Sequence, residues 1–426
     1  MYKWYANGFR KSEFYYEEDN IMKKMKSVVS LMAAAALLAG TIAGCGGNAG
    51  GSSAPAGEST ATEAAEGSAS SGATFKIGSI GPLTGGAAAY GLAVVNSVEL
   101  AVNEINANGG INGYQVEMKG EDDELNAEKS VNAYNTLKDW GMQFLVGSTT
   151  SACSLAVSEN THEDNMFQLT PSASAADCVN YDNVFRVCFS DPNQGLASAQ
   201  YIGSKKLASK VAIIYDSSDV YSSGIYQTFA QEASNQGFEV VSAEAFTADS
   251  KTDFSVQLQK AKDAGAELLF LPIYYTEASL ILTQANTMGY APIFFGVDGM
   301  DGILTVENFD TSLAEGLMLL TPFAADATDD LTVNYVKNYQ EKYGETPNQF
   351  GADAYDAVYI IKQCLEEAGA TPDMSVSDLC ETLKSQIVKI TASGLTSDTM
   401  TWDASGEPNK EPKAVVIKDG AYVTAE

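Results

Sequence analysis

Residues 147–174 read GSTTSACSLAVSENTHEDNMFQLTPSAS, and this stretch predicts how the chain around it folds. Residues 144–146 form an apolar strand that runs into a turn of glycine and hydroxyl side chains. A helical run over 152–164 and a second strand over 166–169 follow, and this strand ends in another hydroxyl turn at 170–174. Because ligands of open α/β sheets bind outside the carboxyl ends of the strands, the two turns predict a ligand site at one sheet edge.

Ser151 stands where the helical run begins, and serine is a preferred N-cap residue. An N-cap here places the free N–H groups and the positive end of a helix beside the hydroxyl turn. Together these groups predict a cradle for a small anion such as a carboxylate. The alternative is that the serines and threonines only cap helices and fill turns, which is their commoner role.

Composition excludes several classes of partner and cofactor. The 426-residue chain has a formal net charge of −30, whereas nucleic-acid phosphates require lysine and arginine. The single histidine, His162, lies beside Glu163 and Asp164, which is typical of a solvated helix surface, and it lacks partners for a metal site or a general base. The glycines at 78–86 do not have the spacing of a nucleotide-binding loop. We therefore expect no nucleic acid, metal or cofactor.

Residues 1–44 are predicted to be a signal peptide, and its export features lie in residues 22–44. Residues 22–45 read MKKMKSVVSLMAAAALLAGTIAGC, in which lysines, an apolar run and small residues precede Cys45. The last four of these residues resemble a bacterial lipobox, which implies lipidation of Cys45. The segment before Met22 fits no export signal, so we interpret Met22 as the initiator. Residues 45–73 predict a flexible tether, held by the lipid to the outer face of the cell membrane.

The rest of the chain alternates strands and helices, which is typical of parallel sheets covered on both faces. The alternation starts again after residues 191–193, which predicts a second α/β unit. We expect two hinged, Rossmann-like lobes with a ligand cleft between them. Lobe 1 is predicted to consist of residues 74–191 and 325–388, and lobe 2 of residues 192–324 and 389–426.

Several motifs carry a resemblance to a known family. Residues 81–85 (GPLTG) and 104–113 (EINANGGING) match its opening pattern, residues 295–299 (FGVDG) resemble its acidic turn, and residues 394–406 resemble its closing hairpin. The chain from about residue 75 to 423 is similar to the branched-chain amino-acid-binding (Leu/Ile/Val-type) family of periplasmic solute-binding proteins. These proteins have the type I fold and supply ABC importers.

The resemblance implies a role for each matching residue. Ser151 and the second hydroxyl turn are implied to bind the α-carboxylate of an amino acid, and Asp298 is implied to bind its α-ammonium group. This division agrees with the chemistry of a zwitterion, which needs donors at one end and an anion at the other. Aromatic residues are implied to close over the side chain. The implied ligand-binding residues are Ser151, Ser172, Ala173, Ser174, Tyr221, Tyr275, Asp298, Tyr90, Tyr274 and Phe350.

The resemblance therefore implies an extracytoplasmic lipoprotein that captures an amino acid, branched-chain ones included, and delivers it to the permease subunits of an ABC transporter. A sensory or regulatory ligand-binding protein, and a binder of another small carboxylate or amide, remain as alternatives. We do not expect an enzyme, because a nucleophile such as Ser151 needs a base and His162 offers no evident site.

Five cysteines remain besides Cys45, and none shows the spacing of a zinc site. An exported protein can carry disulfides. The sequence allows a disulfide between Cys178 and Cys188, a disulfide between Cys364 and Cys380, or a fully reduced state, and does not decide among them.

Overall fold

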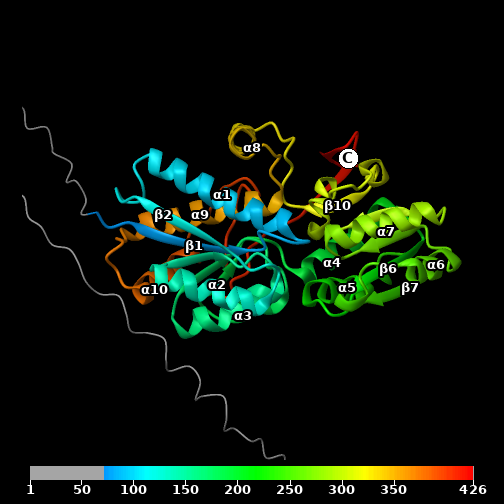
Figure 1. The fold of residues 1–426 in the computed structure, drawn as a ribbon, viewed down its shortest axis with the longest axis horizontal. Coiled ribbons are helices and arrows are strands. Elements are labelled where there is room, and N and C mark those ends of the chain that lie inside the picture. Colours follow the sequence, from blue (N-terminus) through cyan, green and yellow to red (C-terminus); the bar gives the residue numbers. More distant parts are fainter. Residues whose placement is uncertain (1–71, 426) are drawn as a thin grey trace, which may run out of the picture. The chain divides into compact units, whose positions relative to one another are not determined.

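The structure, a computed structural model, describes residues 72–425 (Figure 1). The predicted signal peptide, Cys45 and almost all of the tether lie outside the described residues. Within these residues the chain forms two sheets, one of five strands and one of seven, each flanked by helices. The expected pair of α/β lobes is thereby confirmed.

The five-stranded sheet of the first lobe has the order β2-β1-β3-β4-β5, and all its neighbouring strands are parallel. Helix α1 lies above this sheet in Figure 1, and α2 and α3 lie below it. Both faces are therefore covered, which explains why all four residues of β3 and of β4 are buried. The elements are β1 (Phe75–Gly81), α1 (Ala88–Ala107), β2 (Val116–Asp122), α2 (Ala127–Trp140), β3 (Phe144–Gly147), α3 (Ser151–Glu163), β4 (Phe167–Thr170), η1 (Ala176–Val179) and β5 (Val184–Arg186).

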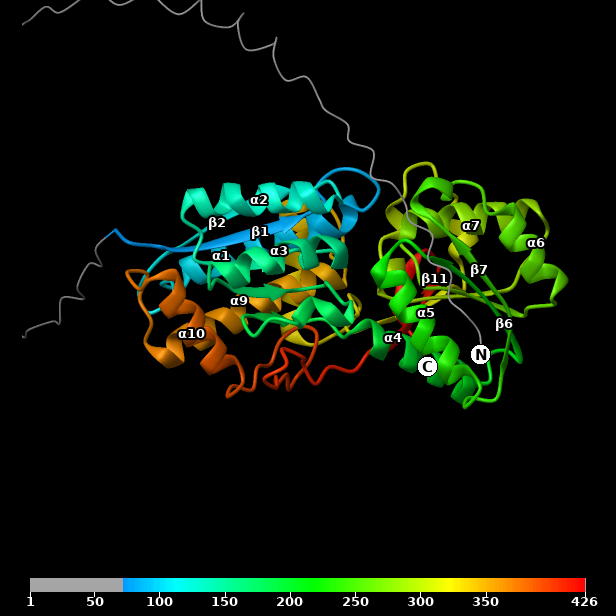
Figure 2. The same cartoon turned by 90° about the horizontal axis from the view of Figure 1, so that it is seen from below.

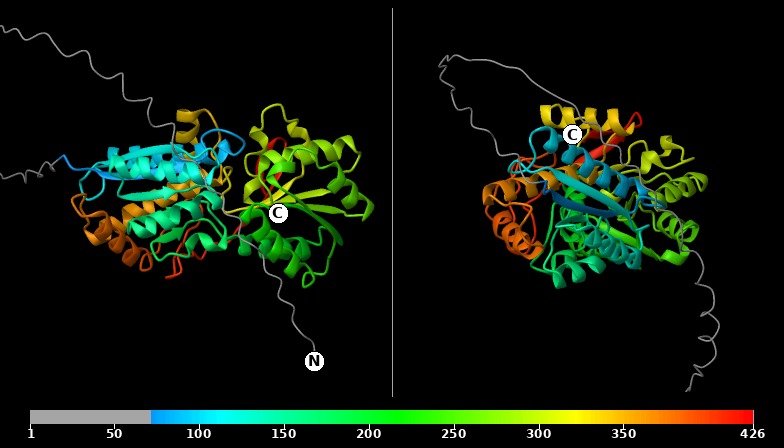
Figure 3. Two further views of the ribbon diagram at one scale, coloured as in Figure 1. Left: turned by 60° about the horizontal axis from the view of Figure 1, so that its bottom comes forward. Right: turned by 60° about the vertical axis from the view of Figure 1, so that its left-hand side comes forward.

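The seven-stranded sheet of the second lobe has the order β12-β11-β10-β9-β8-β6-β7. Its strands are parallel except at the end of the sheet, where β11 and β12 run antiparallel to their neighbours. The left panel of Figure 3 shows these C-terminal strands, in red, inside the second lobe. The elements are α4 (Asp191–Lys205), β6 (Lys210–Asp216), α5 (Val220–Ala233), β7 (Glu239–Phe246), η2 (Ala248–Ser250), α6 (Ser255–Asp263), β8 (Leu268–Leu271), α7 (Tyr275–Thr287), β9 (Ile293–Gly296), η3 (Asp298–Met300), η4 (Ile303–Thr305), η5 (Thr311–Ala314), β10 (Met318–Thr321), β11 (Lys413–Lys418) and β12 (Ala421–Thr424).

Three later helices return to the first lobe, as the sequence predicted. They are α8 (Asp330–Tyr343), α9 (Gln349–Ala368) and α10 (Val376–Ile387), and both α8 and α9 pack on α1. Figure 2 shows α9 and α10 beside the first sheet and α4 and α5 beside the second. The chain passes between the lobes after β5, after β10 and again before β11. None of the helices described is long and apolar enough to cross a membrane.

The third of these passages corrects the predicted domain limits. The prediction assigned all residues from 389 onward to lobe 2, but residues 395–410 are held by the first lobe. The N–H groups of Leu395 and Thr396 donate to Asp356 of α9, and Lys410 forms a buried ion pair with Asp353 of α9. The chain therefore joins the second lobe only at β11, because these polar contacts hold it against α9 until then.

Several local predictions also differ from the structure. Helix α4 was not predicted, although Pro192 in its first turn is a residue that favours a helix start. Strands β5 and β12 were not predicted because they are short. Around residues 400–402, within the segment that resembles a closing hairpin, strand pairing is present only as isolated bridges. All five cysteines in the described chain are buried and free, so neither of the two disulfides that the sequence left open is formed.

Candidate functional site

The first hydroxyl turn lies between β3 and α3. Ser151 is the first residue of α3 and not its N-cap, which is Thr150, so the predicted cap is wrong. The Ser151 Oγ instead accepts hydrogen bonds from the backbone N–H groups of Ser174 and Ala175, both at 3.1 Å. Since both bonds use its lone pairs, the Ser151 hydroxyl proton remains to be donated. The first N–H groups of α3 have no partner within the helix and add to this donor cluster.

The second hydroxyl turn follows β4 and is held by a buried arginine. Arg186, which is 0% exposed, donates to the carbonyl oxygens of Ala173, Ala175 and Ala176. With its carbonyl groups tied to this cation, the turn keeps one conformation beside the first turn. The Ser172 Oγ donates to the Thr149 carbonyl oxygen at 2.6 Å, which joins the two turns directly.

The acidic turn lies in the second lobe, where η3 follows β9. Asp298 is 3% exposed, and its carboxylate accepts hydrogen bonds from the Tyr221 hydroxyl (2.6 Å), the Gly299 N–H (2.7 Å) and the Gln194 side-chain amide (2.9 Å). A Cβ at Gly299 would lie 2.5 Å from the Tyr221 hydroxyl, so glycine at this position lets the tyrosine reach the carboxylate. A carboxylate has about four acceptor positions, so one remains for a further donor.

The charge of Asp298 is not balanced by any of these three partners. Burial raises the pKa of the Asp298 carboxyl to about 7, against the lowering effect of its hydrogen bonds. Asp191, at the start of α4, is also buried, and its pKa lies well above the usual range because of burial and in spite of a hydrogen bond from Ser174. A cation that entered beside Asp298 would be attracted strongly in this poorly solvated place.

Four aromatic residues stand near these turns. The Tyr90 ring contacts Phe350 at a centroid distance of 4.5 Å, Tyr275 at 5.0 Å and Tyr274 at 5.5 Å. The Tyr90 hydroxyl also donates to the Gly299 carbonyl oxygen, which links α1 of the first lobe to η3 of the second. These rings supply apolar walls with polar tips.

A small cavity between the lobes brings most of the predicted residues together. Its volume is about 20 Å³, close to what a single water molecule needs, so a larger ligand requires the lobes to separate. Of the ten implied residues, eight line it, whereas Ala173 and Tyr275 do not. The Ala173 N–H is taken by the Thr170 hydroxyl at 2.9 Å, and the Tyr275 hydroxyl accepts from the Ala89 N–H at 3.2 Å. The lining residues are Tyr90, Thr149, Thr150, Ser151, Ser172, Ser174, Tyr221, Tyr274, Asp298, Gly299 and Phe350.

Sequence reasoning missed four members of this site, one of which is Gly299 in the acidic turn. Thr149 and Thr150 line the cavity, and both stand in the quoted stretch, where the hydroxyl signal covered them without singling them out. The buried Thr150 Oγ1 has no hydrogen-bond partner among the described residues. Gln194, which bonds Asp298 from 104 residues away, gave no local signal because its role depends entirely on the fold.

The described residues show no arrangement for metal chemistry. Within residues 72–425 no group of three or more His, Cys, Asp or Glu side chains is placed to hold a metal ion. His162 is half exposed, stacks on Tyr181 and does not line the cavity. The arrangement is therefore one of donors in the first lobe and a carboxylate in the second, closed over by aromatic rings, which is the construction of a two-lobed solute-binding protein.

Comparison with known proteins agrees with this class. A sequence model of the periplasmic binding protein family matches residues 74–416, so the chain belongs to this family, which binds solutes outside the cytoplasm. The chain is 32% identical to Leu/Ile/Val-binding protein homolog 3 of Brucella melitensis over 71% of its length and 81% of that protein. It is 27% identical to the leucine-, isoleucine-, valine-, threonine- and alanine-binding protein of Pseudomonas aeruginosa, over 72% of this chain and 81% of that protein.

A solved structure shows the same fold. The branched-chain amino acid transporter substrate-binding protein of Streptococcus pneumoniae, solved in complex with isoleucine, superimposes with a TM-score of 0.74 at 27% identity, over 83% of this chain and 99% of that one. The expected type I fold and the resemblance to branched-chain amino-acid-binding proteins are thereby confirmed.

Proposed function

We propose that this protein captures an amino acid between its lobes, with branched-chain side chains among the candidates, and delivers it to the permease subunits of an ABC transporter. The observation that carries the proposal is the arrangement around one cavity: hydroxyl turns and a helix N-terminus on one side, and buried Asp298 on the other. The donors fit an α-carboxylate, and Asp298 with its remaining acceptor position fits an α-ammonium group.

The ten residues implied by the sequence take different parts in this proposal. Ser151 binds the carboxylate, Asp298 and Tyr221 lie at the ammonium end, and Tyr90 with Phe350 closes over the side chain. Ser174 positions Ser151, because its N–H donates to the Ser151 hydroxyl and its side chain donates to Asp191. Ser172 and Ala173 shape the second turn, because their polar groups are already bonded within the protein. Tyr274 stacks on Tyr221 and Tyr275 packs against Tyr90, so these two support the aromatic wall.

Relatives support an amino acid as the ligand. The names of two relatives include leucine, isoleucine and valine, and the Streptococcus pneumoniae protein holds isoleucine. A small carboxylate without an amino group is the second candidate, because the hydroxyl turns alone offer donors to any carboxylate. A sensory role would use the same site.

Thermal unfolding and titration calorimetry of the full chain with a panel of ligands test the proposal. The panel holds the twenty amino acids, their deamino analogues and aromatic carboxylates. A ligand that binds only the folded state raises the unfolding temperature, and we expect the largest rise from one or a few amino acids. If only deamino acids stabilise the protein, it binds carboxylates and the amino acid proposal is wrong.

We further propose that the protein is a lipoprotein, anchored through Cys45 to the outer face of the cell membrane. The ordered signal features before Cys45 support this. Cys45→Ala should release the protein from the membrane fraction of cells that express it. A variant that stays in the membrane fraction with unaltered processing would refute the anchor.

A further inference from the structure

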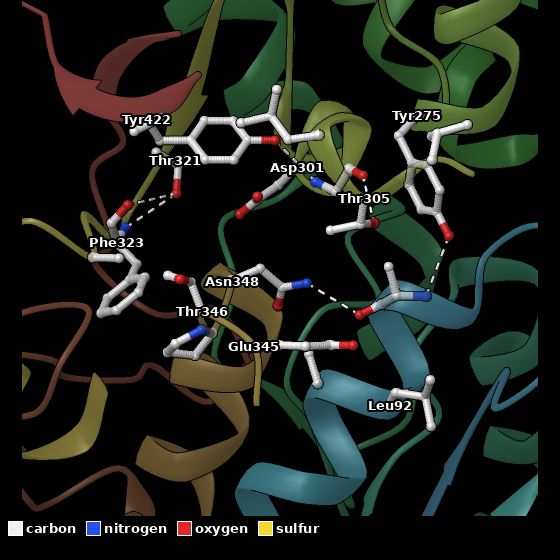
Figure 4. Close-up of a pocket in the computed structure, with 18 of the residues that line it drawn as sticks. Leu92, Tyr275, Asp301, Thr305, Thr321, Phe323, Glu345, Thr346, Asn348 and Tyr422 are labelled. Atoms are coloured by element: carbon white, nitrogen blue, oxygen red, sulfur yellow. Dashed lines mark hydrogen bonds between the residues drawn. The ribbon is translucent and has the colours of Figure 1, made fainter. Parts of the chain in front are cut away.

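A second and much larger cavity lies beside the cleft, and the function proposed above does not use it. Its volume is about 770 Å³, within the usual range of small-molecule sites (Figure 4). Residues of both lobes line it: those of α1, α8 and the segment before α9 from the first lobe, and those of α7, η4, β10, β11 and β12 from the second. In the described chain the two cavities have no lining residue in common.

The walls of this cavity are mostly apolar and include several aromatic rings. Leu319 and Val415 are buried in its wall beside Phe323, and the rings of Tyr339 and Tyr422 face the same space. Figure 4 shows Tyr422, Phe323 and Tyr275 on different sides of the cavity. The Tyr422 hydroxyl accepts a hydrogen bond from the Gly302 N–H at 3.1 Å, so its ring is held in place. Such walls fit an apolar body, and ring faces also attract cations.

The charged residues of the cavity are all acidic. Asp301 is 8% exposed, accepts a hydrogen bond from the Gln349 N–H at 3.1 Å and lies across from Asn348 in Figure 4. Glu307, Asp326 and Glu345 are exposed at the rim. Among the described residues, none of those lining the cavity is lysine, arginine or histidine, and no ion pair involves any of these four carboxylates.

From this combination we infer that the cavity binds an organic cation with an apolar body, such as an alkylammonium compound. The apolar walls bury the hydrocarbon part, and the four carboxylates with the tyrosine rings balance the positive charge. An anionic ligand of the same size would bury its charge among carboxylates, which is strongly unfavourable. Because both lobes line the cavity, a bound cation also stabilises the arrangement of lobes that forms it.

Titration calorimetry with hexyltrimethylammonium tests the inference on the full chain, and hexanoate serves as the probe of opposite charge. We expect the cation to bind at least about tenfold more tightly than hexanoate. A triple variant, Glu307→Gln, Asp326→Asn and Glu345→Gln, should weaken cation binding about tenfold, since it removes three exposed charge interactions, each of them weak by itself. Ala421→Trp, at an exposed position of the cavity wall, should block it.

Two controls separate this site from the cleft and from a general charge effect. The variant Asp249→Asn, Asp373→Asn and Glu411→Gln changes the net charge equally at exposed positions outside the cavity, and it should bind the cation as the parent does. Asp298→Asn should also leave cation binding unchanged. Equal binding of hexanoate, or loss of cation binding in Asp298→Asn but not in the rim variant, would overturn the inference. Neither result depends on whether the cleft binds an amino acid.

Discussion

The buried carboxylates of Asp298 and Asp353 differ in the groups that surround their charge. Asp298 lies in the cleft, and Asp353 lies where α9 contacts the C-terminal segment. Asp353 is 2% exposed and forms an ion pair with Lys410, whose ammonium group also donates to the Thr396 hydroxyl at 2.6 Å. Asp298 is 3% exposed, yet its partners are a phenol, an amide and a backbone N–H, all neutral.

We propose that this difference distinguishes a structural carboxylate, Asp353, from a ligand-binding one, Asp298. A buried charge is tolerated when a countercharge accompanies it, and the protein supplies one to Asp353. Among residues 72–425 no such cation stands at Asp298, and burial raises the pKa of its carboxyl to about 7. The cation that completes the cleft is therefore expected to come with the ligand.

The largest effect is expected at the structural pair. Lys410→Met leaves the Asp353 charge buried without a partner, which should lower the free energy of unfolding by roughly 3 to 5 kcal/mol. Urea denaturation followed by circular dichroism measures this. The double variant Lys410→Met with Asp353→Leu removes both charges and should recover most of the loss. A single variant as stable as the parent would show that Asp353 does not need its cation.

In the first lobe, across the cleft from Asp298, Ser151→Ala should weaken amino acid binding by roughly 1.5 to 3 kcal/mol, because it removes a hydrogen bond to the ligand carboxylate. It should also lower stability, since the N–H groups of Ser174 and Ala175 lose their acceptor. Ser158→Ala, in the same helix, removes a bond to the Leu155 carbonyl oxygen outside the cavity and is the matched control. Equal calorimetric affinities for the two variants would place the ligand carboxylate elsewhere.

Amino acid affinity should depend on pH through Asp298. Binding of an ammonium group needs the ionised carboxylate, and below a pKa of about 7 the free protein holds it protonated. Affinity should therefore fall by up to tenfold, about 1.4 kcal/mol, for each pH unit below 7 and level off above it. Asp353 adds negative charge near this group, and Asp191, whose pKa burial raises well above its usual range, titrates close to it, so the slope must be compared with that of Asp298→Asn. A parent affinity that is constant from pH 5 to 8 would contradict the assignment.

The smallest effect is expected at Thr150. Its buried hydroxyl has no partner among the described residues, so Thr150→Val should leave stability unchanged or raise it by up to about 1 kcal/mol. Ligand affinity should fall by roughly 0.5 to 1.5 kcal/mol if this hydroxyl bonds the ligand, as its place in the cavity suggests. A loss of stability similar to that of Ser151→Ala would show that the hydroxyl is already used within the protein.

Much of the fold could be predicted because the strands are short apolar runs followed by clear turn residues. The two hydroxyl turns and the acidic turn lie at strand ends, as the alternation of apolar runs and turn residues in the sequence predicted. The exact use of each polar group could not be predicted. The Ser151 hydroxyl can cap its own helix or accept a hydrogen bond from Ser174, and contacts between separate segments decide which. The bond from Gln194 to Asp298 and the path of residues 395–410 depend on such contacts too.

The central claim is that Asp298 binds the ammonium group of an amino acid whose carboxylate meets Ser151. Calorimetry at pH 8 with leucine and with 4-methylpentanoate, which lacks only the amino group, tests it most directly on the parent and on Asp298→Asn. We expect the parent to prefer leucine by roughly 3 to 5 kcal/mol and the variant to lose most of this preference. If the parent binds 4-methylpentanoate as tightly as leucine, Asp298 is not the ammonium site and the account is wrong.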